Sequence, residues 1–137
     1  MLKKVYIDED LTVKLQSASG HVMRFYCRVR KRLPIAVSSG YELVRVDQIM
    51  HARASESYTE VFIADGKKFL CSKTLKTIEQ LLHGNNFIRI HQSHLVNPDF
   101  VVRIIKCERS SVVLENGLVI PIARSRKKET INFLMSI

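Results

Sequence analysis

The sequence lacks tryptophan altogether and holds only three cysteines and five glycines among its 137 residues. The cysteines are odd in number, far apart and outside any C-x-x-C pair, so neither a disulfide framework nor a zinc knuckle is indicated. The motifs G-x-x-x-x-G-K, G-x-G-x-x-G, H-E-x-x-H and G-x-S-x-G are also absent, so nothing indicates a phosphate-cradling loop or a common hydrolase site. With aromatic residues at 7%, a stacking platform for single-stranded nucleic acid is not favoured. We therefore expect no cofactor and no enzyme activity.

Acidic residues are scarce as well, with 13 Asp and Glu against 22 Lys and Arg, so the formal net charge is +9. The basic excess is densest in "RVRKR" at residues 28–32 and in "RSRKK" at residues 124–128. This charge favours a polyanionic partner or an anionic surface, and charge alone does not choose between them.

Long hydrophobic runs are also missing. No segment approaches the ~18 apolar residues of a membrane span, and the opening "MLKKVYIDED" is charged where a signal peptide is apolar. These absences predict a soluble cytoplasmic protein without a membrane partner. The length and the 46% of apolar residues allow about one domain with a hydrophobic core.

Turn chemistry recurs at short intervals along the chain, with short strand-like runs between the turns. Asp65-Gly66 and Asn116-Gly117 are each flanked by such runs. These pairs are typical of two-residue type I′ hairpins, which need positive φ at both central positions. The pattern predicts a mainly β, antiparallel fold.

Two segments break the β pattern. Within residues 72–85 apolar residues recur at helical spacing, Ser72 can cap the start and Gly84 can end the helix. A second, shorter helix is expected after Ser125. The expected core positions are Leu75, Ile78, Leu81 and Leu82 in the first helix and Ile131, Leu134 and Met135 in the second.

The chain divides into an N-terminal extension, residues 1–33, and a main domain, residues 34–137. The extension has the composition of short strands and no assigned role. Pro34 and the Ser-Ser-Gly turn at residues 38–40 indicate the start of the main domain.

The segment "FIRIHQSHLVN", residues 87–97, holds two histidines three positions apart. On a helix they would share a face and could chelate a metal. The flanking aliphatic residues instead indicate short strands, in which positions of odd separation point to opposite faces, so His91 and His94 are expected to be split. A catalytic histidine would need a nucleophile and an orienting group that the segment does not offer.

Three expected loops carry side chains suited to DNA. Arginine reads guanine O6 and N7, and glutamine reads adenine N6 and N7. Gln92 lies at one expected loop tip, Arg124 with Ser125 at a second, and Tyr58 with Ser57 in a third. Loops held on a rigid sheet can enter a groove while neighbouring residues hold phosphates. The candidates for phosphate contacts are Lys73, Arg89, Arg126, Lys127 and Lys128.

These residues resemble the LytTR family of bacterial DNA-binding domains over about residues 34–135. The resemblance is most specific in the pattern F-x-R-x-H-x-S-x-x-V-N from Phe87 to Asn97. A strand, an Asn-Gly turn and an I-P-x-x-R segment ending at Arg124 follow at the distance seen in the family.

The family implies an elongated antiparallel β fold of small stacked sheets with one or two short helices. Its loops enter neighbouring major grooves, usually at tandem sites where two copies bind, and it is often the output half of a response regulator. Carried over by position, the base-contacting residues are Tyr58, Gln92 and Arg124. The residues that contact the DNA backbone or shape the loops are His91, Ser93, Arg89 and Lys73.

The sequence departs from the family at three points. Gln92 replaces the usual basic residue or asparagine, and Ala123 stands where a serine often precedes the arginine, with Ser125 after it. Both changes bear on base preference. Residues 1–33 are too few for a receiver domain, so the input signal and its partner are expected to lie elsewhere, or binding is constitutive.

A second function remains open on the sequence alone. The two basic clusters also suit an interaction module, a β domain that binds an acidic protein or an anionic surface.

Overall fold

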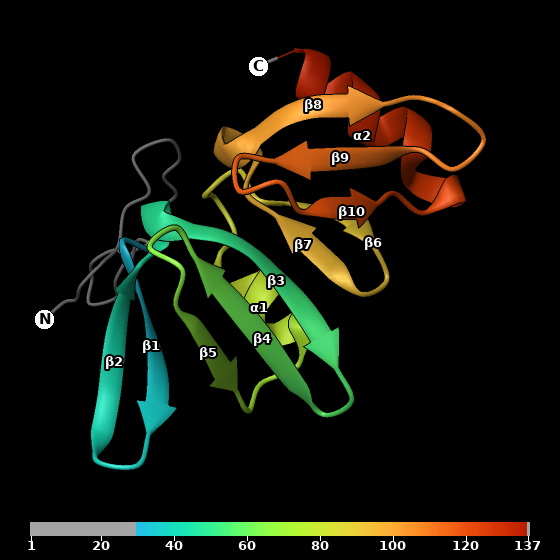
Figure 1. The fold of residues 1–137 in the computed structure, drawn as a ribbon. Helices are drawn as coiled ribbons and strands as arrows, with labels where there is room; N and C mark the ends of the chain where they lie inside the picture. Colours follow the sequence, from blue (N-terminus) through green and yellow to red (C-terminus); the bar gives the residue numbers. More distant parts are fainter. Residues whose placement is uncertain (1–29, 137) are drawn as a thin grey trace, which may run out of the picture.

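The computed structural model describes residues 30–136, and in this range the chain forms three small antiparallel sheets and two short helices (Figure 1). The mainly β, stacked-sheet fold predicted from the sequence is confirmed. No helix among the described residues is long and apolar enough to cross a membrane.

The first sheet is a hairpin of β1 (Arg32–Val37) and β2 (Gly40–Arg45) that projects to one side in Figure 1. Leu33 and Ile35 face the core and are almost completely buried. Arg32 and Leu33 therefore belong to the first strand, two residues before the expected domain boundary at residue 34. The other strands expected in the N-terminal extension fall in residues 1–29, outside the described residues.

A five-stranded sheet, in the order β5-β4-β3-β7-β6, forms the middle of the fold. Its strands are β3 (Ile49–Ser55), β4 (Tyr58–Ile63), β5 (Lys68–Cys71), β6 (Ile88–His91) and β7 (His94–Val96). A short 3-10 turn, Val46–Gln48, leads from β2 into this sheet, and another, Pro98–Phe100, leads out of it.

The third sheet has the order β10-β9-β8 and stacks beside the middle sheet. Its strands are β8 (Val101–Ile105), β9 (Ser111–Leu114) and β10 (Val119–Pro121). A last 3-10 turn, Arg124–Arg126, runs directly into α2 (Lys127–Met135).

Both predicted hairpin turns form, although neither is type I′. Gly66 has φ 97°, whereas Asp65 keeps negative φ. The amide of Gly66 donates to the carbonyl of Ile63 at 2.9 Å and the amide of Ile63 donates to the carbonyl of Lys67 at 2.9 Å, which is the pattern of a type I turn followed by a left-handed glycine. The Asp65 carboxylate accepts from the Lys67 amide and so favours this alternative turn. The Asn116–Gly117 turn has the same arrangement.

The helix α1 (Leu75–Leu81) confirms the predicted apolar face but not the predicted cap. Thr74, not Ser72, is the N-cap, and its Oγ1 accepts from the Thr77 amide at 3.2 Å. Ser72 cannot be the N-cap because the chain has only just left β5 at this position. The main chain there is fixed by the Thr59 hydroxyl, which donates to the Lys73 carbonyl at 2.7 Å. Gly84 follows the helix with φ 92°, as expected of a helix-ending glycine.

The helix α2 begins at Lys127, close to the predicted position, but it buries a different set of residues. Thr130 is fully buried, whereas Met135 is 73% exposed, so the expected core role of Met135 is wrong. Leu134 packs against the core as predicted. Met135 is the last residue of the helix.

Two hydrophobic cores lie on the two sides of the middle sheet. The first core packs α1 and the β1–β2 hairpin against one face of that sheet, and Ile78 and Leu95 are fully buried in it. The second core joins residues of the middle sheet such as Ile90 and Val96 to the third sheet and α2. Both cores therefore contain residues of the middle sheet.

Candidate nucleic-acid interface

One end of the middle sheet collects several of the predicted site residues. The β3–β4 turn brings Ser57 and Tyr58 there, both exposed, with Tyr58 at 49% exposure. Lys73 comes to the same end because Thr59 pairs with Cys71 across β4 and β5 and also bonds to the Lys73 carbonyl. Thr59 is fully buried, so this link between the two loops is shielded from water.

The β6–β7 turn places Gln92 and Ser93 at this end of the sheet as well, and the predicted strand-turn-strand arrangement is confirmed. The Ser93 carbonyl accepts from the Ala54 amide at 2.9 Å, which ties this turn to β3. The Ser93 amide donates to Nδ1 of His91 at 3.0 Å. Gln92 is exposed, so its side chain is presented to the solvent by a turn fixed on both sides.

Arg89 stabilises the same turn through hydrogen bonds to its main chain. Its guanidinium donates to the carbonyl of His91 at 3.0 Å and to the carbonyl of Gln92 at 2.6 Å. It also forms an ion pair with Glu79 of α1 at 2.7 Å. Only 16% of the Arg89 side chain is exposed, so this arginine holds the turn and is poorly available to a phosphate. Glu79 was not singled out from the sequence, because only the fold brings α1 beside β6.

The two histidines of the motif lie side by side, so the expected split between them is wrong. His91 and His94 are directly opposite in the β6–β7 pairing, and their ring centroids are 5.2 Å apart. Within one continuous strand, residues separated by an odd number of positions point to opposite faces of the sheet. His91 and His94 are in two strands joined by a tight turn, and residues that pair directly across such a turn point to the same face. The His94 ring continues toward His51, with 6.0 Å between their centroids.

His51 and His94 are held in the neutral form. Burial is the main cause that lowers the pKa of His51 to about 4, and the nearby His94 and Arg53 lower it further. Burial likewise lowers the pKa of His94 to about 4, with help from His91 and Arg53. In the part of the chain that the structure describes, no three His, Cys, Asp or Glu side chains are grouped so as to hold a metal ion.

The third predicted loop is the 3-10 turn that starts at Arg124. Arg124, Ser125 and Lys128 are exposed, whereas Arg126 and Lys127 are half-buried. The turn is tied to β6, because the Ala123 amide donates to the Ile90 carbonyl at 2.8 Å and Arg126 donates to the Arg89 carbonyl at 3.4 Å.

Lys127 points its Nζ at the carbonyl of Cys107, 3.3 Å away, in the loop between β8 and β9. That loop also carries Lys106, Glu108 and Arg109, all exposed, and so adds one net positive charge near the Arg124 turn. Sequence reasoning missed these residues, because nothing in the sequence indicates that the β8–β9 loop returns to this place.

The three turns lie along one side of the molecule, on the right in Figure 1, although up to 34 residues separate neighbouring ones in the sequence. β6 supports two of them, since it carries the turn of Gln92 and accepts the bonds that fix the turn of Arg124. The turn of Tyr58 follows β3, which is tied to the Gln92 turn by the bond from the Ala54 amide to the Ser93 carbonyl. The arrangement offers several exposed donors and basic side chains on a rigid frame.

Comparison with known proteins agrees with this geometry. The family described as the LytTr DNA-binding domain matches residues 39–135. The fold resembles a solved structure titled LytTr DNA-binding domain of a putative methyl-accepting/DNA response regulator from Bacillus cereus, with a TM-score of 0.67 and 21% identity. The similarity covers 77% of this chain and 97% of that one.

Two curated relatives are similar over part of their length. The sensory transduction protein LytT of Bacillus subtilis (strain 168) is 31% identical over 99 residues, which cover 69% of this chain and 41% of the relative. The heme-containing CO-sensing transcriptional regulator RcoM 2 of Paraburkholderia xenovorans (strain LB400) is 24% identical over 98 residues, 69% of this chain and 36% of the relative. Since the family matches most of the chain, the protein belongs to the LytTR family of DNA-binding domains.

Proposed function

We propose that the chain recognises a specific double-stranded DNA sequence through the turns that carry Tyr58, Gln92 and Arg124, and that it regulates transcription from such sites. The observation that carries the proposal is the convergence of these three exposed side chains on one side of the fold. The relatives, a sensory transduction protein and a transcriptional regulator, support the regulatory part.

The rigidity of the turns supports a role in reading bases. Hydrogen bonds between main-chain atoms fix the Gln92 turn to β3 and the Arg124 turn to β6. Side chains on such turns lose little further backbone freedom on binding, which lowers the entropic cost of a specific contact. The major groove is the surface that distinguishes all four base pairs, and arginine and glutamine have the donors to read it.

Two exposed lysines are best suited to hold phosphates beside these turns. Lys73 lies next to the Tyr58 turn and Lys128 lies next to the Arg124 turn. Neither ammonium group has an ion-pair or hydrogen-bond partner among residues 30–136, in contrast to Lys127 and Arg89. A phosphate contact would fix the orientation of the domain without contributing sequence information.

Affinity measured on two duplexes and at several salt concentrations tests the proposal. A cognate duplex is first selected from random sequences and then compared with a scrambled one. Arg124→Ala should cost about 1–3 kcal/mol on the cognate duplex and little on the scrambled one, because a base contact is lost. Lys128→Ala should weaken both duplexes equally and reduce the salt slope by about one unit, because a phosphate contact is lost.

Identical effects of Arg124→Ala and Lys128→Ala on both duplexes would remove the base-reading role. Equal affinity for heparin, anionic vesicles and any duplex would instead favour a general interaction module that binds acidic partners. Gln92→Ala is the matched test at the second turn, and its loss should concern a different base pair from that of Arg124→Ala.

A further inference from the structure

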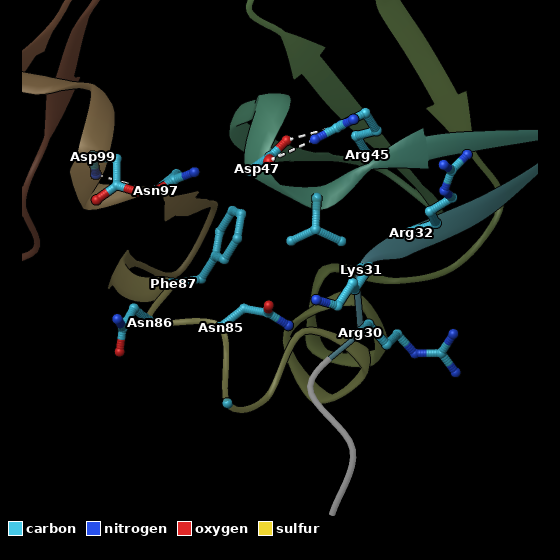
Figure 2. A pocket seen from close by; sticks show the side chains of 12 residues that line it. Arg30, Lys31, Arg32, Arg45, Asp47, Asn85, Asn86, Phe87, Asn97 and Asp99 are labelled. Carbon is cyan, nitrogen blue, oxygen red and sulfur yellow. Dashed lines mark hydrogen bonds and ion pairs between the residues drawn. The ribbon is translucent and has the colours of Figure 1, made fainter. Parts of the chain in front are cut away.

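A pocket of about 480 Å³ lies at the opposite end of the middle sheet from the three turns (Figure 2). Its walls come from the start of β1, the end of β2 with the 3-10 turn that follows it, the loop after α1, and the 3-10 turn after β7. The volume is in the range of sites that bind small molecules or short peptide segments. We call this cavity the basic pocket.

The charges that line the basic pocket are mainly positive. Arg30, Lys31 and Arg32 stand along one side, and none of them forms an ion pair with a carboxylate among residues 30–136. Arg45 is different, because it pairs with Asp47 at 3.1 Å. The remaining carboxylate of the lining, Asp99, leaves a net excess of two positive charges: four basic side chains against two acidic ones.

The pocket also holds an unused donor and an apolar wall. Nδ2 of Asn85 is buried and has no hydrogen-bond partner among the described residues, which is costly for an amide unless a ligand supplies an acceptor. Figure 2 shows Asn85 and Lys31 near each other on one side of the pocket, with the Arg45–Asp47 pair on the opposite side. Phe87 and Val46 supply apolar surface between these groups. A ligand suited to this lining carries carboxylates next to an apolar side chain.

We propose that the basic pocket receives the acidic segment at residues 6–10 of this chain, "YIDED". Asp8, Glu9 and Asp10 are the only acidic residues among residues 1–29, and Tyr6 and Ile7 directly precede them. The carboxylates match the free cations and the orphan amide, and the two apolar side chains match the wall formed by Phe87 and Val46.

The connection along the chain permits this contact within one molecule. Residues 11–29 separate the acidic segment from Arg30, which itself lines the pocket. A chain of that length reaches up to about 60 Å when extended, far more than the pocket requires. Tethering also raises the effective concentration of the segment to about the millimolar range, so a weak site is occupied without a tight interaction. This inference is independent of the proposed DNA contacts, which lie at the other end of the sheet.

Nuclear magnetic resonance on the full chain tests the inference. The probes are the side-chain amide of Asn85 and the backbone amides of residues 84–87, compared with those of the Gln92 turn as an internal control. Replacing Asp8→Asn, Glu9→Gln and Asp10→Asn together should shift the pocket probes and leave the turn probes unchanged. A synthetic peptide of residues 4–12, added to this neutralised variant, should return the pocket probes toward their original positions.

Charge exchange sharpens the test. Lys31→Glu with Arg32→Glu should abolish the effect of the peptide or weaken its binding at least tenfold, roughly 1.4 kcal/mol. Adding Asp8→Lys, Glu9→Lys and Asp10→Lys to that variant should restore the original pocket resonances.

Two results would overturn the inference. One is that neutralising the acidic segment leaves the probes of residues 84–87 unmoved. The other is that inorganic phosphate shifts these probes while the peptide does not, which would make the cavity a small-anion site.

Discussion

His51 is a buried residue of β3, with its ring stacked on Phe62 at 4.5 Å between centroids and its Nδ1 buried without a partner among the described residues. Its pKa is lowered to about 4, against an ordinary value of 6.5, mainly because burial disfavours the charged ring. The unfolded chain therefore takes up this proton first as the pH falls. The stabilising effect of the neutral ring is complete above the ordinary pKa and is lost as the pH falls toward the folded pKa.

The free energy of unfolding should accordingly fall by about 2 kcal/mol for His51 between about pH 7 and about pH 5, with a smaller loss from the more exposed His94. Urea unfolding at a series of pH values measures this. His51→Phe, which keeps an aromatic ring against Phe62, should flatten most of the slope. A slope unchanged by His51→Phe would contradict the assignment.

The histidines also illustrate what can be predicted for single residues. The strand character of residues 88–96 follows from composition, and Gln92 with Ser93 was correctly placed at the turn. The contact between His91 and His94 was not foreseen, because it depends on the exact length of the turn. The braces that fix the turn, Glu79 and Ala54, come from elsewhere in the fold and leave no local sequence signal.

At the scale of elements, α1 is the clearest link between a sequence pattern and packing. Ile78 is fully buried in the first core, and Leu75 and Leu82 are almost as buried. The helix is only seven residues long, too short to be stable alone, so its packing on the sheet is what holds it. It in turn positions Glu79 against Arg89 beneath the Gln92 turn.

Ile78→Ala should lower the free energy of unfolding by about 2–5 kcal/mol, because it removes buried methyl groups and leaves a cavity. Lys76→Ala on the exposed face of the same helix is the matched control and should change stability by less than about 0.5 kcal/mol. Chemical denaturation with a two-state fit measures both. Equal, small effects would mean that the helix does not pack by this face.

The elements differ in how far the sequence predicts them. The glycines of the Asp-Gly and Asn-Gly pairs mark both turns correctly, since Gly66 and Gly117 both adopt positive φ. The turn type was wrong because the Asp65 and Asn116 side chains bond to amides two residues ahead and favour negative φ at their own positions. The position of the N-cap at Thr74 depends on where β5 ends, and this is set by a tertiary contact, the bond from the Thr59 hydroxyl to the Lys73 carbonyl.

At the scale of the whole molecule, the predicted stack of small sheets is confirmed, while the convergence of the three turns required the structure. For the turns of Tyr58 and Gln92 it arises from register, because β3, β4, β5, β6 and β7 each begin or end at the same end of the middle sheet. The turn of Arg124 follows β10 of the third sheet and joins them through its hydrogen bonds to β6. The register between strands depends on which side chains of the paired strands are buried together. A sequence pattern describes one strand at a time, so it does not predict this register.

We expect two copies to bind side by side on repeated DNA sites and to associate weakly or not at all without DNA. The reason is that the proposed contacts lie along one side of the fold, so one molecule covers only a short stretch of a groove. Sedimentation of the protein with a two-site duplex should give a complex of two chains, whereas a one-site duplex should give a complex of one. A stable dimer in the absence of DNA would contradict this expectation.

The hydrogen bonds that fix the main chain of the Gln92 turn bear on how a new DNA target preference can arise. Arg89 bonds to the main-chain carbonyls of His91 and Gln92, and Ala54 bonds to the carbonyl of Ser93, so no bond to the side chain of residue 92 is needed to shape the turn. Any of several residues at position 92 can therefore be presented from the same backbone. If Gln92 reads a base as proposed, a library randomised at this one codon should yield folded proteins with altered target preference, without compensating changes elsewhere.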